Sequence, residues 1–141
     1  MPEFTRQEIE LSFVLRDLGV AWLPKAGDWA ASLESRDVAL VLGVTHDNLL
    51  ITTQDPSQAI SRAQFFWLPL ESQIRKLIFS NNLEFMSLEG GSNFYKAYAW
   101  IRKDDWKTAE PENVWGKGDT PREAMMSLLI KAYSGELEWG Y

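Results

Sequence analysis

The chain has 141 residues, 45% of them hydrophobic and 13% aromatic, which predicts one folded domain with a substantial core. Its 20 acidic and 14 basic residues leave a net charge of −6, which disfavours duplex nucleic acid as a partner because phosphate-binding surfaces need clustered Lys and Arg. The absence of cysteine excludes disulfides and thiolate metal sites. No apolar run is long enough for a membrane helix and no signal peptide is visible, so we expect a cytoplasmic protein that makes no use of a membrane.

The first predicted element is a helix over residues 5–18. Thr5 and Glu8 form a capping box, and Gly19 is the expected stop. One apolar face consists of Leu11, Val14, Leu15 and Leu18. Ile9 and Phe13 project from nearly the opposite side, and a helix that is apolar on two sides is covered on both. These two residues therefore either pack under a later segment of the same chain or form a partner-binding surface.

Short strands separated by turns follow the first helix. Residues 29–53 predict an antiparallel meander in which 38–44, apolar on both faces, is the central strand. Asp55 and Pro56 resemble an N-cap and a first-turn proline, which predicts a helical turn through residue 63. Residues 65–68 are then an extended apolar linker that ends at Pro69, and residues 70–82 are an amphipathic helix.

The second half of the chain predicts a hairpin and a final helix. The strands are 83–89 and 94–102, joined by a glycine-rich turn, with a polar loop at 103–112 and a short strand at 114–117. Thr120, Pro121 and Glu123 are typical of a helix start. The apolar face of this last helix consists of Met125, Leu128, Leu129, Ala132 and Tyr133. The tail alternates Leu137, Trp139 and Tyr141, which suits pairing at a sheet edge.

The strand 94–102 has two different faces. Tyr95, Ala97, Ala99 and Ile101 point one way, and the two alanines allow a helix to approach closely. The opposite face carries Phe94, Lys96, Tyr98, Trp100 and Arg102. Aromatic and basic residues on a sheet are typical of single-stranded nucleic acid platforms, but packing against a protein fits an acidic chain better. We therefore assign Phe94, Tyr98 and Trp100, with Ile9 and Phe13, as partner-binding residues.

The residues that bear reactive groups form no recognisable catalytic pattern. His46 is the single histidine and lies beside Asp47 in a predicted hairpin loop. A transition-metal site would have to consist of carboxylates, and no Asp/Glu cluster has a suitable spacing. We therefore expect no catalytic residue, no cofactor and no metal. The alternative is an enzyme that uses carboxylates around Asp104, Asp105 and Glu110.

The predicted element order is helix, three strands, helix, two strands with a short third, and helix, which is an α+β fold with an antiparallel sheet. This order, with Gly27-Asp28-Trp29 opening the first strand and Leu49-Leu50 after a polar turn, resembles the type III secretion chaperone-like fold, including the YbjN-like family, over residues 5–133. The resemblance implies a homodimer that binds other proteins and has no catalytic residues. The turn at 55–63 and the loop at 103–112 depart from the family pattern.

A second resemblance is local. A strand pair followed by Gly118-Asp119-Thr120-Pro121, then Glu123-Ala124, is similar to the end of HicB-type antitoxin domains and of phage-type αβββα sandwiches, over residues 94–133. An antitoxin- or immunity-like inhibitor of a basic protein is therefore the alternative to a chaperone- or adaptor-like binding module.

The chain also contains a weak sign of internal duplication. Leu11, Val14 and Leu15 match Ile74, Leu77 and Ile78 at a constant spacing, which would divide the single domain of residues 1–141 into halves at 1–63 and 64–141.

Overall fold

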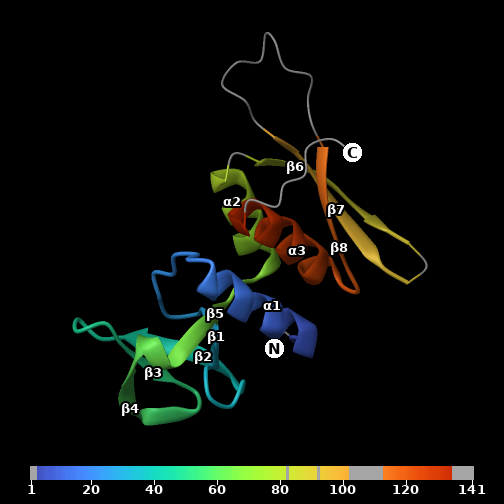
Figure 1. The fold of residues 1–141 in the computed structure, drawn as a ribbon. Helices are drawn as coiled ribbons and strands as arrows, with labels where there is room; N and C mark the ends of the chain where they lie inside the picture. Colours follow the sequence, from blue (N-terminus) through green and yellow to red (C-terminus); the bar gives the residue numbers. More distant parts are fainter. Residues whose placement is uncertain (1–2, 82, 92, 102–112, 135–141) are drawn as a thin grey trace. The chain divides into compact units, whose positions relative to one another are not determined.

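The structure is a computed structural model that describes residues 3–81, 83–91, 93–101 and 113–134 (Figure 1). It has three α-helices and two antiparallel sheets, so the predicted α+β class is confirmed. Contacts divide the chain into two compact units, Met1–Leu70 and Glu71–Tyr141. A single domain and an internal duplication remain predictions.

The first unit is a helix followed by a five-stranded antiparallel sheet with strand order β4-β3-β2-β1-β5. Its elements are α1 (Arg6–Asp17), β1 (Trp29–Ser32), β2 (Val38–Val44), β3 (Leu49–Thr52), β4 (Asp55–Ser61), the 3-10 helix η1 (Arg62–Gln64) and β5 (Phe65–Leu68). The predicted meander over 29–53 is confirmed, with β2 between β1 and β3. β2 is not covered along its whole length, because Leu42 is 47% exposed.

The helix α1 begins as predicted but packs through residues other than those of its predicted core face. The Thr5–Glu8 capping box is present, and Gly19 follows the helix with a φ of +93°. Leu15 is buried, but Val14 is 38% exposed. The sheet is covered instead by Phe4, Ile9 and Phe13, which pack against Ala31, Phe66 and Leu68 of β1 and β5.

Two predictions in the first unit are wrong. Residues 55–61 form strand β4 rather than a helical turn, because they pair with β3, and only Arg62–Gln64 is helical. β4 lies at the sheet edge, where the missing N–H of Pro56 is tolerated. Residues 65–68 are not a linker but strand β5, which pairs with β1 from Trp29↔Leu68 to Ser32↔Phe65.

The second unit has two helices on a three-stranded antiparallel sheet of order β6-β7-β8. Its elements are α2 (Glu71–Ser80), β6 (Leu83–Gly90), β7 (Tyr95–Ile101), β8 (Asn113–Gly118) and α3 (Pro121–Ser134). The predicted helices and the 83–102 hairpin are confirmed within a few residues at their ends. The loop 103–112 and the tail after residue 134 lie outside the described residues.

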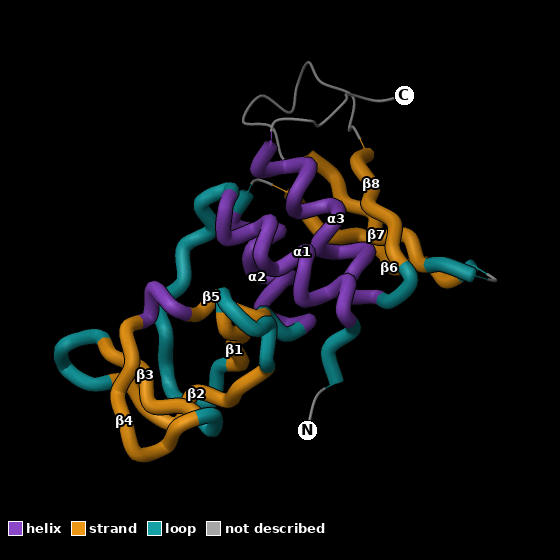
Figure 2. The backbone as a smooth tube through the Cα atoms, turned by 60° about the horizontal axis from the view of Figure 1, so that its bottom comes forward, coloured by secondary structure: helices purple, strands orange, loops and turns teal. Residues whose placement is uncertain are grey.

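Both helices lie on one face of this sheet, as Figure 2 shows. On α2, Ile74 and Ile78 are buried, and on α3 the buried residues include Met125, Leu128 and Leu129. The approach of α3 to β8 is close because Gly116 and Gly118 have no side chain. A Cβ built on Gly116 would collide with the backbone N of Leu128 and lie 2.5 Å from the carbonyl O of Ala124.

Thr120 opens α3 as predicted, since its Oγ1 accepts a hydrogen bond of 3.1 Å from Glu123 N. Among the described residues, no helix is long and apolar enough to cross a membrane.

Candidate binding face of the second unit

The sheet face opposite α2 and α3 gathers aromatic and basic side chains. We call it the β7–β8 face; its members are Phe94, Lys96, Tyr98, Trp100, Trp115 and Lys117. Side chains alternate between the faces of a strand, and Ala97, Ala99 and Gly116 are buried on the helix side. The intervening residues of β7 and β8 therefore point to the other side.

The strand register fixes which of these residues are neighbours. Across β7 and β8, Tyr98 pairs with Trp115 and Lys96 pairs with Lys117. On the other side of β7, Glu89 of β6 lies opposite Lys96. Two lysines are therefore direct cross-strand partners on the same face, beside a Tyr–Trp pair.

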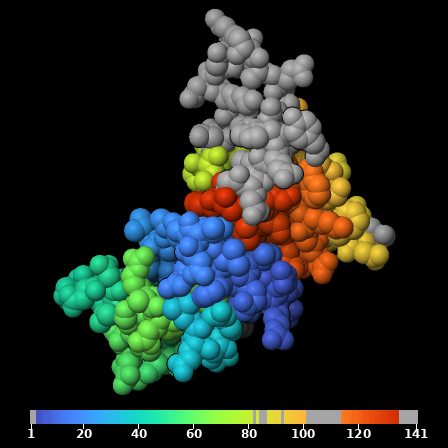
Figure 3. Space-filling model, in the orientation of Figure 1, coloured from blue at the N-terminus to red at the C-terminus, as the bar shows by residue number. Residues whose placement is uncertain are grey.

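The β7–β8 face is partly open to solvent. Trp115 is 41% exposed, and Lys117 is exposed, while Phe94, Tyr98 and Trp100 are half-buried. Atoms of β8, in orange, form part of the surface in Figure 3. A tryptophan that keeps this much apolar area in water is typical of binding surfaces.

Lysine ammonium groups lie over the aromatic rings of this face. Lys117 Nζ is 4.2 Å from the centroid of the Phe94 ring, and Lys96 Nζ is 4.7 Å from that of Trp115. Each distance is within the range of a cation–π contact. The lysine stems thus cover aromatic surface while the ammonium groups remain at the face.

A third lysine reaches β8 from the final helix. Lys131 Nζ donates a 2.7 Å hydrogen bond to the Trp115 carbonyl and lies 4.2 Å from the centroid of the Trp115 ring. β8 is an edge strand. A lysine on its carbonyl occupies a position that an added strand would need, a common protection of sheet edges.

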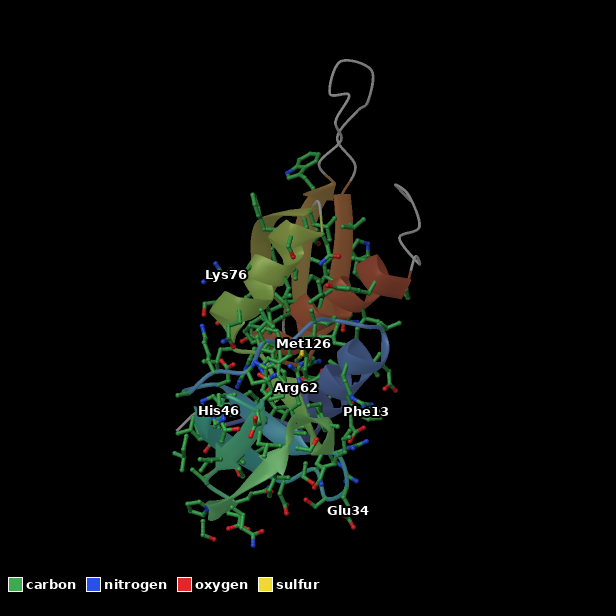
Figure 4. All side chains as sticks on the ribbon, turned by 90° about the vertical axis from the view of Figure 1, so that its left-hand side faces the viewer. Phe13, Glu34, His46, Arg62, Lys76 and Met126 are labelled. Carbon is green, nitrogen blue, oxygen red and sulfur yellow. The ribbon has the colours of Figure 1, made fainter. Side chains whose placement is uncertain are left out.

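The structure places the predicted partner-binding residues in two different settings. Phe94, Tyr98 and Trp100 lie on the β7–β8 face. Ile9 and Phe13 pack within the first unit, where the rings of Phe13 and Phe66 meet edge-on with centroids 5.6 Å apart. Phe13 is labelled on α1 in Figure 4. Two alternatives were predicted for Ile9 and Phe13, and the structure shows the one in which they pack under a later segment of the same chain.

Of the residues considered for catalysis, the structure describes His46 and its neighbour Asp47. His46 is 94% exposed, and its Nε2 is 3.7 Å from Asp47 Oδ1. Within the described ranges, no three His, Cys, Asp or Glu side chains are grouped so that they could hold a metal ion. Asp104, Asp105 and Glu110 lie outside the described residues, so the carboxylate enzyme stays an untested alternative.

The chain matches no protein-family model, no curated protein and no solved structure. The resemblances to type III secretion chaperone-like, YbjN-like and HicB-type domains therefore remain predictions.

Sequence reasoning missed Trp115, Lys117 and Lys131 as members of this neighbourhood. The alternation of the 94–102 strand identified only the β7 half. A usable signal was the alternation of Trp115 and Lys117 around the small residue Gly116, which mirrors Lys96 and Tyr98 around Ala97.

Proposed function

We propose that this protein is a non-catalytic protein-binding module, chaperone- or adaptor-like, that holds its partner on the β7–β8 face. The observation that carries the proposal is the sheet of the second unit, which has both helices on one face and leaves a 41% exposed Trp115 on the other. Tyr, Trp and Phe side chains are enriched at protein interfaces, and this surface gathers all three.

The sign of the charge on this face helps to choose between two kinds of partner. Lys96 and Lys117 make it locally positive, although the chain carries a net charge of −6. An inhibitor of a basic protein would need to use a different, acidic surface. The β7–β8 face thus supports the adaptor-like function rather than the antitoxin- or immunity-like alternative.

The charge also bears on self-association. A two-fold dimer with its axis at the Lys96–Lys117 pair would bring the pairs of two copies together, and like charges across an interface oppose association. We therefore propose a different protein as the partner on this face. The homodimer implied by the family resemblance remains a prediction that would use another surface.

Site-specific photocrosslinking tests the proposal. A photoreactive amino acid would replace Trp115 in the full chain, expressed in the cells that naturally make it. Leu23 is the matched control position, because it is also apolar and is 86% exposed but lies in the first unit. We expect the same protein to be captured repeatedly from position 115 and not from position 23.

The captured protein would then be purified and titrated against the chain. We expect Tyr98→Ser to weaken the dissociation constant by about tenfold or more, as loss of an aromatic anchor usually does, and Leu23→Ser to leave it unchanged. Equal capture from both positions, or a complex that is indifferent to Tyr98→Ser, would count against the proposal.

A further inference from the structure

We propose that the partner segment on the β7–β8 face is an extended acidic peptide, whose carboxylate lies at the Lys96–Lys117 pair and whose next apolar side chain lies on Tyr98 and Trp115. This inference rests on the proposed function and adds the chemistry of the partner to it. The juxtaposition that carries it is a like-charged cross-strand pair next to an aromatic cross-strand pair on one open face.

The lysine pair gives the face an uncompensated positive charge. Lys96 and Lys117 are directly opposite on neighbouring strands, an arrangement that destabilises a sheet. Glu89 of β6 faces Lys96 from the far side of β7, while Lys117 belongs to the edge strand β8. A carboxylate placed between the two ammonium groups would relieve their repulsion, so the unliganded face already has charge complementarity to an anion.

Aromatic rings hold the two ammonium groups in place. Lys117 Nζ lies 4.2 Å from the Phe94 ring centroid and Lys96 Nζ lies 4.7 Å from that of Trp115. These contacts hold the ammonium groups near the surface, where they can still donate hydrogen bonds. Charge-assisted hydrogen bonds are strong because the donor is ionised, and a donor already in place loses less side-chain entropy on binding.

The spacing along the strands selects an extended peptide. Lys96 and Tyr98 are two residues apart on β7, and Lys117 and Trp115 are two residues apart on β8. Residues i and i+2 of an extended peptide also project on the same side, about 6.6–6.8 Å apart. An acidic residue of such a peptide can therefore lie at the lysine pair while an aromatic or aliphatic residue two positions later lies at the Tyr98–Trp115 pair.

The same contacts argue against two other modes of binding. Single-stranded nucleic acid is held by cations that follow its backbone, whereas Lys96 and Lys117 of this face form one cross-strand pair. Strand addition at β8 would need the outer carbonyls of that edge, and the Trp115 carbonyl already accepts a hydrogen bond from Lys131. Side-chain recognition across the face is the mode that remains.

The test is fluorescence polarisation with the full chain and defined probes. The probe is a labelled ten-residue peptide with Glu and Phe alternating at every second position and Ser between them. The first comparison peptide has Gln in place of Glu, and the second comparison probe is a ten-nucleotide oligouridylate. We expect the Glu peptide to bind at least about tenfold more tightly than either, and its affinity to fall as salt is raised.

Two charge-matched variants locate the site. Lys96→Gln with Lys117→Gln removes two positive charges from the face, and Lys25→Gln with Lys76→Gln removes two from exposed positions elsewhere. We expect the first variant to weaken binding of the Glu peptide by about tenfold or more and the second to change it less than twofold. A thermal melt of each variant confirms that it is folded.

Several results would overturn the inference. Equal binding of the Gln peptide would show that the face takes apolar segments without regard to charge, which leaves the proposed function standing. Tighter binding of oligouridylate would assign the face to nucleic acid. No binding of the Glu peptide, or equal losses in both double variants, would show that the lysine pair does not recognise carboxylates.

Discussion

Lys96 of β7 lies directly opposite Lys117 of β8, on a face of the sheet that the helices of the same unit leave uncovered. Two positive charges in direct cross-strand register reduce the stability of the sheet. A binding surface can hold such a pair because the ligand, rather than the fold, compensates the charge. A substitution that removes one of these two positive charges should therefore raise the stability of the fold and weaken binding of the ligand.

We predict that Lys117→Glu stabilises the fold and weakens binding of acidic peptide. Opposite charges across the strands gain about 1 kcal/mol over like charges, and loss of the exposed contact with Phe94 costs about 0.5 kcal/mol. The net gain of about 0.5 kcal/mol corresponds to a rise in melting temperature of about 1–2 °C at low salt. Circular dichroism melts measure it, with Lys76→Glu as the control of equal charge change; an equal rise in both variants would contradict the account.

Gly116→Ala tests the close approach of α3 to β8. The new Cβ would collide with the backbone of Leu128 and Ala124, and backbone cannot rotate away as a side chain can. We expect a loss of about 1–3 kcal/mol, the usual cost of overpacking a core. Urea denaturation measures it. Gly43→Ala is the control, because nothing lies within 4 Å of a Cβ there; equal losses at both positions would show that α3 does not pack as described.

Arg36 joins the first helix to its sheet. Its guanidinium carbon lies 4.2 Å from the Phe13 ring centroid and 5.3 Å from that of Phe66, and its Nε is 3.1 Å from Glu10 Oε1. We predict that Arg36→Gln lowers the free energy of unfolding by about 1–2 kcal/mol, mostly through the two ring contacts. Arg75→Gln, which removes an exposed ion pair with Glu71, should cost less than about 0.5 kcal/mol. Indistinguishable denaturation curves for the two variants would refute the stacking role.

Replacing Ile9 and Phe13 together with Gln separates stability from assembly. Both side chains pack on Ala31, Phe66 and Leu68, so the change places amides in an apolar contact. We expect a loss of about 2–4 kcal/mol and a melting temperature many degrees lower, with no change in elution from a sizing column. Val14→Gln on the same helix, at a 38% exposed site, should be nearly neutral. An unchanged melting temperature with altered elution would show instead that Ile9 and Phe13 form a partner-binding surface.

The elements that sequence predicted well are those defined by local chemistry. Thr5 and Glu8 each accept a hydrogen bond from the other's backbone N–H, and Thr120 accepts one from Glu123 N. No distant contact is needed to form these helix starts. The alternation of Ala97 and Ala99 with Tyr98 was equally local, because the two faces of a strand follow from its period of two.

The elements that sequence mispredicted depend on pairing between distant segments. Asp55 and Pro56 carry a helix-start pattern, but pairing with β3 overrides it. The four residues Phe65–Leu68 are all apolar, so they show no hydrophobic alternation from which a strand could be predicted. Their pairing with β1 makes them a strand. The β8 half of the candidate face was missed for a related reason. The sequence alone does not specify the register of β8 against β7, and this register places Lys117 opposite Lys96.

The most direct test of the central claim is an amide and indole NMR titration of the full chain with the Glu–Phe peptide. We predict that the resonances of the β7 and β8 amides and of the Trp115 indole N–H shift, while those of the Trp22 and Trp29 indoles in the first unit stay in place. Shifts confined to the first unit, or no shifts at concentrations that saturate polarisation, would contradict a partner site on the β7–β8 face.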